Sequence, residues 1–578
     1  MTISVKADGD VTKGIKQKLL FVGIDSADPD YIDRRIAEGA LPNIASFKKD
    51  GAWGKMRSTF PVLSSAAWST ISTGLPPEKH GIYEFFRRKP GTWQDEPVHG
   101  GMKKGDDFWQ ICAAKGYKTV VINMPITYPP KPVNNGIIVS GMDTPGEGVE
   151  FTYPKEVRDE LLREVPGYRI EQTAAQFDTV EHFLEASSQM MKDRLEAALY
   201  LFNKHNPDLA VVIFTALDRV LHALWKYVDP AHPAYNYPEA EKWRKKVDVL
   251  YDEVDQHLGK LMEWAGSDTT TIICSDHGSG AVHGVFFLNR WLMREGYLAL
   301  KGLAGKSLAM KTGVQLQNWV KRNVPRPVKN IFNKFAPQLY SNIETRHGLS
   351  LIEPSLTLVY SWRKTDVMRL NLSGREPGGI VILGKEAENI QIEMKRKLEN
   401  LTDARAEFSG YKPIRKVWTR KEAYPLSDEL DDCPDLVIEW NDRLYSVDTT
   451  LDNPDGQLFI TEEKPDKPWR EEINGDHALH GIFGAKGKKI NPGSNLGIIE
   501  ILAVAPSVLN MLGIAKNNEM PGVVPQEMLN KELVTTMLVQ EVPDDKIESK
   551  EKQDQVSDVY TDEERKIIEK RLRDLGYM

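Results

Sequence analysis

The stretch KLLFVGIDSADPD, residues 18–30, decides the fold class of this 578-residue chain. Its first seven residues are a short apolar run, as expected of a strand buried on both faces of a parallel sheet. Two similar runs follow much later, LAVVIFTAL at 209–217 and TTTIIC at 269–274, and helical patterns at 179–204 and 237–264 accompany them. Buried strands that alternate with helices predict an α/β fold with a mostly parallel central sheet flanked by helices.

A metal-capable residue follows each of the three apolar runs. Asp25 follows the first, Asp218 the second, and Asp276 with His277 the third. A single aspartate after a strand is unremarkable, because aspartate is common in turns and helix caps. In a parallel sheet, however, functional residues gather at the carboxyl ends of the strands. Three such endings therefore predict a shared site at one edge of the sheet.

The segment TFPVLSSAAWSTISTG, residues 59–74, contains the candidate nucleophile. A helix is expected over 65–73, closed by Gly74 and stopped by the prolines at 76 and 77. Ser64 would then lie at a helix N-terminus, where free N–H groups and the helix dipole favour an anion. On the local sequence alone, an ordinary N-cap serine is the commoner explanation, so the case for Ser64 depends on its neighbours.

Histidines complete the candidate site. Asp218 and His222 are four residues apart on a predicted helix, so they share one face and can bind one metal. His477 lies in the glycine-rich stretch NGDHALHGIFGAKG. His80, His283 and His480 are comparable loop histidines that would at most support the ligands. The predicted metal-binding set is Asp25, Ser64, Asp218, His222, Asp276, His277 and His477.

This ligand set predicts two divalent cations. Carboxylate oxygens and imidazole nitrogens without a thiolate suit Zn²⁺, and Mn²⁺ is the alternative. Two such ions carry more positive charge than three aspartates cancel. The surplus would depress the pKa of the Ser64 hydroxyl and bind an anionic phosphate ester. The chain has no G-x-S-x-G elbow, no phosphate-binding P-loop and no dinucleotide fingerprint.

Composition narrows the class of protein. The chain is 41% hydrophobic and 27% charged, as in ordinary globular proteins, and its formal charge of −8 argues against nucleic acid as a partner. Its first residues lack the apolar core of a secretory signal, and no uncharged apolar run approaches the ~20 residues that span a membrane. Three widely spaced cysteines predict no disulfide framework. We therefore expect a cytoplasmic protein.

The chain divides into six predicted segments. They are a polar tail (1–16), the first part of a metallohydrolase core (17–300), a basic amphipathic insertion or cap (301–350), a mixed α/β continuation of core or cap (351–470), the last part of the core with the final ligand (471–520), and a charged linker with a C-terminal helix (521–578). The basic residues of 301–346 predict either a solvated cap or peripheral contact with a membrane surface or a phosphorylated polymer. A T-x-x-E capping box at 561–564 predicts the start of the last helix.

Six segments in order resemble the alkaline phosphatase superfamily, and within it the type I phosphodiesterase/nucleotide pyrophosphatase family. They are GIDSADPD (23–30), LPNIASFKKDG (41–51), TFPVLSSAAWSTISTGLPPEKHGI (59–82), DRVLHALW (218–225), SDHGSGAVHGVFFLNRWL (275–292) and GDHALHGIFGAKG (475–487). The resemblance implies an alkaline-phosphatase-like sheet with insertions and a metal-dependent hydrolase of phosphodiester or pyrophosphate bonds.

The resemblance also implies a role for each candidate residue. One metal would be held by Asp25, Asp276 and His277 with the Ser64 oxygen. The other would be held by Asp218, His222 and His477. Ser64 would attack phosphorus in line and form a covalent phosphoserine that is then hydrolysed, with zinc, or sometimes manganese, as the metal.

Two positions depart from relatives. Many nucleotide pyrophosphatases have a threonine nucleophile and an asparagine three residues later, where this chain has Ser64 and Ala67. Trp68 stands where sulfatases need arginine, which argues against sulfatase activity.

Two alternatives to diester hydrolysis remain. One is a phosphomonoesterase or phosphoryl transferase on the same core. The other is a weakly catalytic binding or assembly protein that acts on anionic lipid or glycan. The substrate would be a small-molecule or lipid- or glycan-linked phosphate ester, and the sequence leaves the oligomeric state open.

Overall fold

A nine-stranded sheet forms the centre of the molecule. The computed structural model describes residues 16–301, 351–530 and 559–575, with short gaps at 362, 406–407, 409, 429–431, 452–454 and 462–473. The strand order is β19-β2-β18-β9-β1-β8-β5-β6-β7. Five strand pairs are parallel, β1 with β8, β1 with β9, β5 with β8, β5 with β6, and β2 with β19. The predicted α/β fold with a mostly parallel sheet is thereby confirmed.

The three apolar runs form three adjacent strands. Their bounds, with those of the other strands in this sheet, are β1 Leu19–Ile24, β8 Leu209–Phe214, β9 Thr270–Cys274, β2 Ala52–Arg57, β5 Thr119–Met124, β6 Gly136–Ser140, β7 Thr152–Tyr153, β18 His480–Lys486 and β19 Ser494–Glu500. β1 lies between β8 and β9, so the ends of all three strands meet at one edge.

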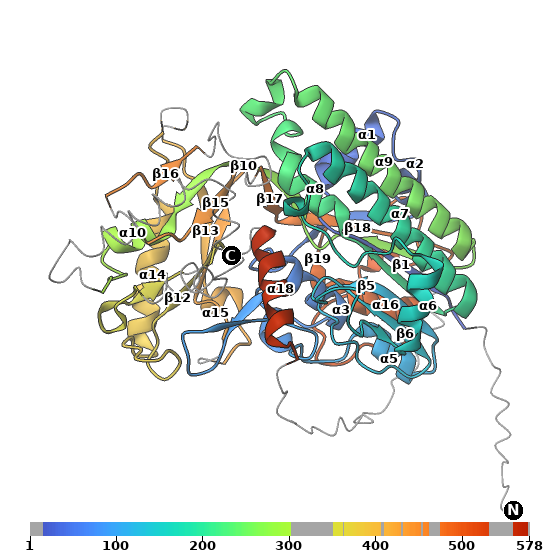
Figure 1. Cartoon of the computed structure of the whole chain (residues 1–578), viewed down its shortest axis with the longest axis horizontal. Helices are drawn as coiled ribbons and strands as arrows, with labels where there is room; N and C mark the ends of the chain where they lie inside the picture. Colours follow the sequence, from blue (N-terminus) through green and yellow to red (C-terminus); the bar gives the residue numbers. More distant parts are fainter. Residues whose placement is uncertain are drawn as a thin grey trace, which may run out of the picture.

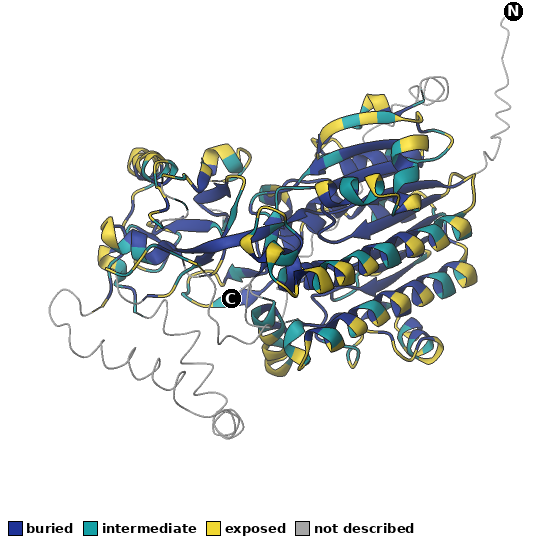
Figure 2. Ribbon diagram, turned by 90° about the horizontal axis from the view of Figure 1, so that it is seen from above, coloured by how far each residue is buried: buried dark blue, intermediate teal, exposed yellow. Residues whose placement is uncertain are grey.

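Helices cover both faces of this sheet because successive strand residues point to opposite sides. Leu20, Val22 and Ile24 of β1 belong to one buried cluster, and Leu19 and Phe21 to the other. On the first face pack α1 Pro29–Ala37, α2 Pro42–Asp50, α6 Glu156–Glu164, α7 Val180–His205, α8 Ala216–Leu224 and α9 Ala240–Ala265. On the second pack α3 Ser64–Thr73, α5 Phe108–Ala114 and α16 Val504–Met511. Figures 1 and 2 show the layers and the buried strands beneath partly exposed helices.

The predicted helices are present, with one informative difference. α7 and α9 coincide with the expected patterns within a few residues, and Gly74 closes α3 in the left-handed conformation at φ 67°. The N-cap of α3 is Leu63, which has no capping side chain, and Ser64 is the first helical residue. The ordinary capping role for Ser64 is therefore wrong, which leaves its hydroxyl available to the site.

A second part with its own core follows the first. A four-stranded antiparallel sheet of β11 Val359–Tyr360, β12 Val367–Leu370, β14 Leu436–Trp440 and β13 Ile414–Thr419 packs with α10 Leu288–Arg294 and α14 Lys385–Glu399. Between the two parts run β10 Gly278–Phe287 and its partners β15 Leu444–Asp448, β16 Phe459–Ile460 and β17 Gly475–Ala478. A buried pair of Arg363 and Glu84, 2.7 Å apart, ties this part to the first.

The remaining elements are short or lie at the end of the chain. They are the hairpin β3 Phe86–Arg88 with β4 Asp95–Pro97, the helices α4 Pro77–His80, α15 Arg420–Ala423 and α18 Asp562–Asp574, and 3₁₀ turns at Ala174–Gln176, Trp225–Tyr227, Pro233–Asn236, Pro354–Leu356, Ile501–Ala503 and Gln526–Met528. The predicted capping box at Thr561 is present. Among the described helices, none has the length and apolar character to cross a bilayer. Beyond residue 301, the basic insertion lies outside the described residues, and the six-segment division stays a prediction.

His80 fastens the helix that carries Ser64. The backbone N–H of Ile82 donates to its Nδ1 at 3.1 Å, so Nε2 carries the proton and faces Thr70 Oγ1 at 3.0 Å. The imidazole is fully buried. Burial, aided by the nearby Lys103 ammonium, lowers the pKa of His80 to about 3. The folded protein therefore holds this imidazole neutral.

This depressed pKa predicts a loss of stability in mild acid. The unfolded imidazole titrates near 6.5, so His80 contributes stability that is present above that pH and is lost as the pH falls toward the folded value. Relative to the non-titrating H80Q variant, we expect the free energy of unfolding of the natural chain to fall by about 2 kcal/mol between pH 7 and pH 5. Urea unfolding of both proteins at the two pH values measures this. A difference independent of pH would contradict it.

Candidate metal centre

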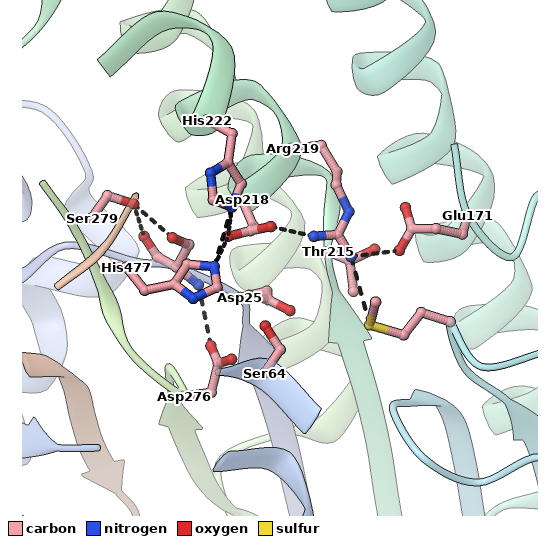
Figure 3. A network of polar contacts seen from close by, with 12 residues as sticks. Asp25, Ser64, Glu171, Thr215, Asp218, Arg219, His222, Asp276, Ser279 and His477 are labelled. Carbon is pink, nitrogen blue, oxygen red and sulfur yellow. Dashed lines mark hydrogen bonds and ion pairs between the residues drawn. The ribbon is translucent and has the colours of Figure 1, made fainter. Parts of the chain in front are cut away.

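The site lies at the carboxyl ends of the three central strands. Asp25 directly follows β1, Asp218 lies in the first turn of α8 after β8, and Asp276 and His277 follow β9. All four side chains are buried. Figure 3 shows Asp25, Asp218 and Asp276 near Ser64 and His477. The sheet thus brings together residues as far apart in the chain as Asp25 and His277.

Ser64 and His477 reach this edge from other elements. Ser64 begins α3, and its Oγ lies 3.1 Å from His277 Nε2, with both residues fully buried. His477 lies on β17, which pairs antiparallel with β10 so that His477 is opposite Ser279. This pairing places a residue from near the end of the core beside the loop that carries Asp276 and His277. All seven predicted residues therefore lie in one neighbourhood.

The ligand atoms form two adjoining groups. In the first, His277 Nε2 is 3.0 Å from Asp276 Oδ2 and 3.8 Å from Asp25 Oδ1. In the second, Asp218 Oδ1 is 3.5 Å from Nε2 of both His222 and His477, and these two nitrogens are 3.1 Å apart. The His277 and His477 rings stack with centroids 3.8 Å apart, so the groups share a border. The metal-capable groups among the described residues are Asp25 with Asp276 and His277, Asp218 with His277 and His477, and His222 with Asp476 and His477. The division into two metal sites implied by the family resemblance stays a prediction.

Backbone carbonyls fix the orientation of each histidine. Nδ1 of His277 contacts the Gly278 carbonyl at 3.0 Å, Nδ1 of His222 contacts the Gly475 carbonyl at 2.8 Å, and Nδ1 of His477 contacts the Val62 carbonyl at 2.8 Å. A carbonyl oxygen only accepts, so each Nδ1 donates its proton. The lone pair of each Nε2 is then directed at the carboxylates, which is the usual arrangement of metal-binding histidines.

The carboxylate oxygens that lack a hydrogen-bond donor indicate what kind of ligand this site can bind. Among the described residues, six buried carboxylate oxygens have no hydrogen-bond donor, and three of the six lie in this site, namely Asp25 Oδ1, Asp218 Oδ1 and Asp276 Oδ2. These are the same oxygens that face the Nε2 lone pairs. Buried lone pairs that face one another are unfavourable unless a cation lies between them. Oxygen and imidazole donors without a thiolate fit divalent ions such as Zn²⁺ or Mn²⁺.

The pKa shifts in the site point to the same need for positive charge. Burial, followed by the negative charges of Asp276 and Asp218, raises the pKa of Asp25 well above its usual range. Burial opposes the charged form of His477, but the negative charge of Asp218, whose Oδ1 lies 3.5 Å from His477 Nε2, outweighs burial and raises the pKa of His477 to about 9. The carboxylates therefore attract any cation that can enter, a proton or a metal ion.

Several residues around the ligands were not predicted as part of the site. Trp68 Nε1 donates to Asp25 Oδ2 at 3.2 Å, and the Ser26 N–H donates to Asp276 Oδ1 at 3.3 Å. Trp68 is four residues beyond Ser64 on one helix, so its place on the same face was readable from the spacing. Ser26 has a left-handed backbone with φ 66°, a strained conformation for a residue with a side chain.

Two acidic residues and one arginine were missed as well. Arg219 ion-pairs with Asp218 Oδ2 and, at 3.1 Å, with Glu171 Oε2. Asp476 can reach a common ion with His222 and His477. Asp476 and Arg219 are sequence neighbours of predicted ligands, but Glu171 gave no signal. In the described residues, His80, His283 and His480 lie outside every metal-capable group.

Comparison with known proteins places the chain in a family. The family model described as "Type I phosphodiesterase / nucleotide pyrophosphatase" matches residues 19–479. The chain therefore belongs to this family and is a hydrolytic enzyme, as the six motifs predicted. No curated protein sequence matches it.

Two solved structures are similar to the chain at low sequence identity. Human ectonucleotide pyrophosphatase/phosphodiesterase 5 is 14% identical, with 91% of this chain and 100% of that chain covered and a TM-score of 0.46. An inactive variant of the murine protein in complex with AMP is also 14% identical, with 89% and 100% covered and a TM-score of 0.47.

The Trp68 bond gives a test of the first ligand group. Replacement of Trp68 by phenylalanine keeps an aromatic ring but leaves Asp25 Oδ2 without its donor. We expect zinc affinity to fall about 10- to 100-fold, as is typical when a partner of a metal ligand is lost. Competition with a fluorescent chelator measures this affinity. The W109F variant, which alters a buried tryptophan outside the site, should bind zinc normally. Equal affinity of W68F and W109F would refute the role of Trp68.

Proposed function

We propose that this enzyme hydrolyses a phosphodiester or pyrophosphate bond with two divalent cations and a covalent phosphoserine at Ser64. The observation that carries this proposal is the convergence of three donor-free carboxylate oxygens and three Nε2 atoms in one buried site, where His277 Nε2 lies 3.1 Å from the Ser64 hydroxyl oxygen. One ion would be held by Asp25, Asp276 and His277 together with Ser64. The other ion would be held by Asp218, His222 and His477. Bound ions would supply Lewis acidity that lowers the serine pKa and neutralises the phosphoryl oxygens.

The chain's own residues account for the remaining steps. The Ser64 hydroxyl gives up its proton, and its oxygen forms a bond to phosphorus while the bond from phosphorus to the leaving-group oxygen breaks and that oxygen takes up a proton. Water then gives up a proton and attacks phosphorus, the bond to Ser64 Oγ breaks, Oγ takes up a proton, and phosphate or a phosphomonoester leaves. Ser64 lies at the N-terminus of α3, so the helix dipole favours negative charge on its oxygen in both steps. Full burial of the serine limits competing contact with bulk water.

Ala67 favours a second candidate function. It lies in α3 in the turn after Ser64, is fully buried, and offers no side-chain donor to a phosphoryl oxygen. The asparagine of many relatives would supply one. This difference supports the phosphomonoesterase or phosphoryl-transferase alternative, in which a dianionic group is held mainly by the cations.

Three parts of the proposal reach beyond the ligand groups. Zinc is the preferred ion because three imidazoles take part, with manganese as the alternative. We place the enzyme in the cytoplasm, supported by three buried cysteines without disulfides. Contact with anionic lipid or glycan through 301–346 stays a proposal from the sequence, since nearly all of that segment lies outside the described residues.

A comparison of model substrates tests the reaction. We expect the zinc- or manganese-loaded enzyme to hydrolyse bis-p-nitrophenyl phosphate, and S64A and D218A to lower kcat at least about 10³-fold, because loss of a nucleophile or ligand disables the whole unit. Faster turnover of p-nitrophenyl phosphate would move the assignment to the monoesterase or transferase alternative. Metal titration of S64A separates the role of Ser64 as nucleophile from its role as a ligand. We expect the variant to bind both ions still, because Asp25, Asp276 and His277 remain.

The covalent step has its own readout. Acid quench during turnover should trap the transferred phosphoryl group on Ser64, with one ester substituent still attached when the substrate is a diester. Mass spectrometry of the peptide that contains residues 59–74 detects it. The S64A protein provides the control peptide. Continued turnover by the S64A variant would contradict the covalent mechanism.

A further inference from the structure

Arg219 is the residue that completes the charge balance around Asp218. Its guanidinium bridges Asp218 Oδ2 and Glu171 Oε2, and the side chains of all three residues are at most 1% exposed. Figure 3 shows Arg219 between the two carboxylates. Because Oδ2 is engaged, Asp218 presents Oδ1 to His222 and His477. The guanidinium thus sets which oxygen of Asp218 faces the candidate metal.

The loop at residues 142–145 supports Arg219 from behind. Met142 Sδ lies 3.6 Å from Arg219 Nη2, in contact range for a thioether and a guanidinium. This loop follows β6, and Asp143 anchors it by accepting from the N–H groups of Thr127 and Tyr128 at 3.2 and 2.8 Å. The position of Met142, and with it the room available to Arg219, therefore depends on how the loop is held.

The C-terminal helix holds this loop. Arg571 of α18 donates to the carbonyls of Met142 at 2.9 Å, Thr144 at 2.6 Å and Pro145 at 3.0 Å. The Tyr560 hydroxyl, just before α18, donates to the Asp143 carbonyl at 2.7 Å. Two side chains thereby engage four consecutive carbonyls. Such a dense set of side-chain bonds to one loop fixes its backbone.

Apolar contacts seat the same helix next to the nucleophile. Ile568 and Leu572 of α18 belong to a buried cluster with Leu63, the residue directly before Ser64. The Tyr560 ring stacks on Tyr128 with centroids 5.8 Å apart. Figure 1 shows α18 beside α3, far in sequence from the rest of the core. The end of the chain is thus built into the wall of the catalytic region.

We propose that Arg219 is a positioning residue for the metal ligand Asp218, and that Tyr560 and Arg571 of the C-terminal segment keep it in place through loop 142–145. Helix α18 is then a structural part of the metal centre, and its docking sets the affinity of the site formed by Asp218, His222 and His477. This inference rests on the proposed use of metal ions at those residues.

Zinc titration of the full chain tests the inference. Direct removal of Arg219 would leave Asp218 and Glu171 buried without a partner and endanger folding. The main test is therefore the Y560F/R571M double variant, which removes the grip on the loop at a distance from the ligands. We expect one of two zinc sites to weaken about 2- to 30-fold, a usual range for coupling through packed residues, while the other keeps its affinity. In the cobalt-loaded protein, the visible absorption of the weakened site should change as well.

Controls separate this outcome from a general loss of structure. K570M removes a positive charge from the exposed side of α18, where Lys570 pairs with Asp574, and should bind both ions normally. The R219K variant keeps the positive charge but loses the planar guanidinium that bridges the Asp218 and Glu171 carboxylates. It should weaken zinc binding at the same site as the double variant. Unchanged affinity and absorption in Y560F/R571M would overturn the inference. Absence of zinc binding to the natural chain would instead overturn the proposed function.

Discussion

The mutual repulsion of three buried carboxylates is the constraint on which the rest of the site depends. Asp25, Asp218 and Asp276 follow three adjacent parallel strands within a few residues of their ends, so the sheet brings their side chains together away from water. Such an arrangement is costly unless donors and cations compensate it. The indole of Trp68, the N–H of Ser26 and the guanidinium of Arg219 each take one oxygen of a different aspartate. The oxygens that remain face the histidines and form the groups that could hold cations.

The chemistry of the site follows from this division of oxygens. Each aspartate uses one oxygen for the protein and directs the other inward, and each histidine does the same with its two nitrogens. The first set of contacts fixes geometry, whereas the second supplies ligands. Ser64 lies among the inward atoms because α3 starts there, with its hydroxyl next to His277. The proposed hydrolysis with cations and a serine nucleophile would need such preorganisation, since rate depends on charge that is placed before the reaction begins.

Other side chains than the candidate ligands also line the region around Ser64. Ala67 gives α3 an apolar face where many relatives offer an amide, while Phe85 and Phe86 join Leu63 and α18 in the adjacent cluster. The C-terminal segment is part of this wall, although in sequence it follows a long charged stretch. Segments far from the motifs therefore shape the surroundings of the nucleophile, and the family motifs alone leave the leaving group open.

The sequence by itself determined the α/β class, the three central strands, α7, α9 and the capping box of α18, because each depends on local apolar patterns or local turn chemistry. It also supplied the seven candidate ligands, since strand ends and i, i+4 spacing are local features as well. Only the tertiary structure decided that Leu63 rather than Ser64 caps α3, that β17 brings His477 to Asp218, and that Glu171, Met142 and Arg571 line up behind Arg219. Apart from the cap of α3, these are contacts between segments tens to hundreds of residues apart. Pairing across such distances is fixed by packing of the whole core, and no local pattern in the sequence records it.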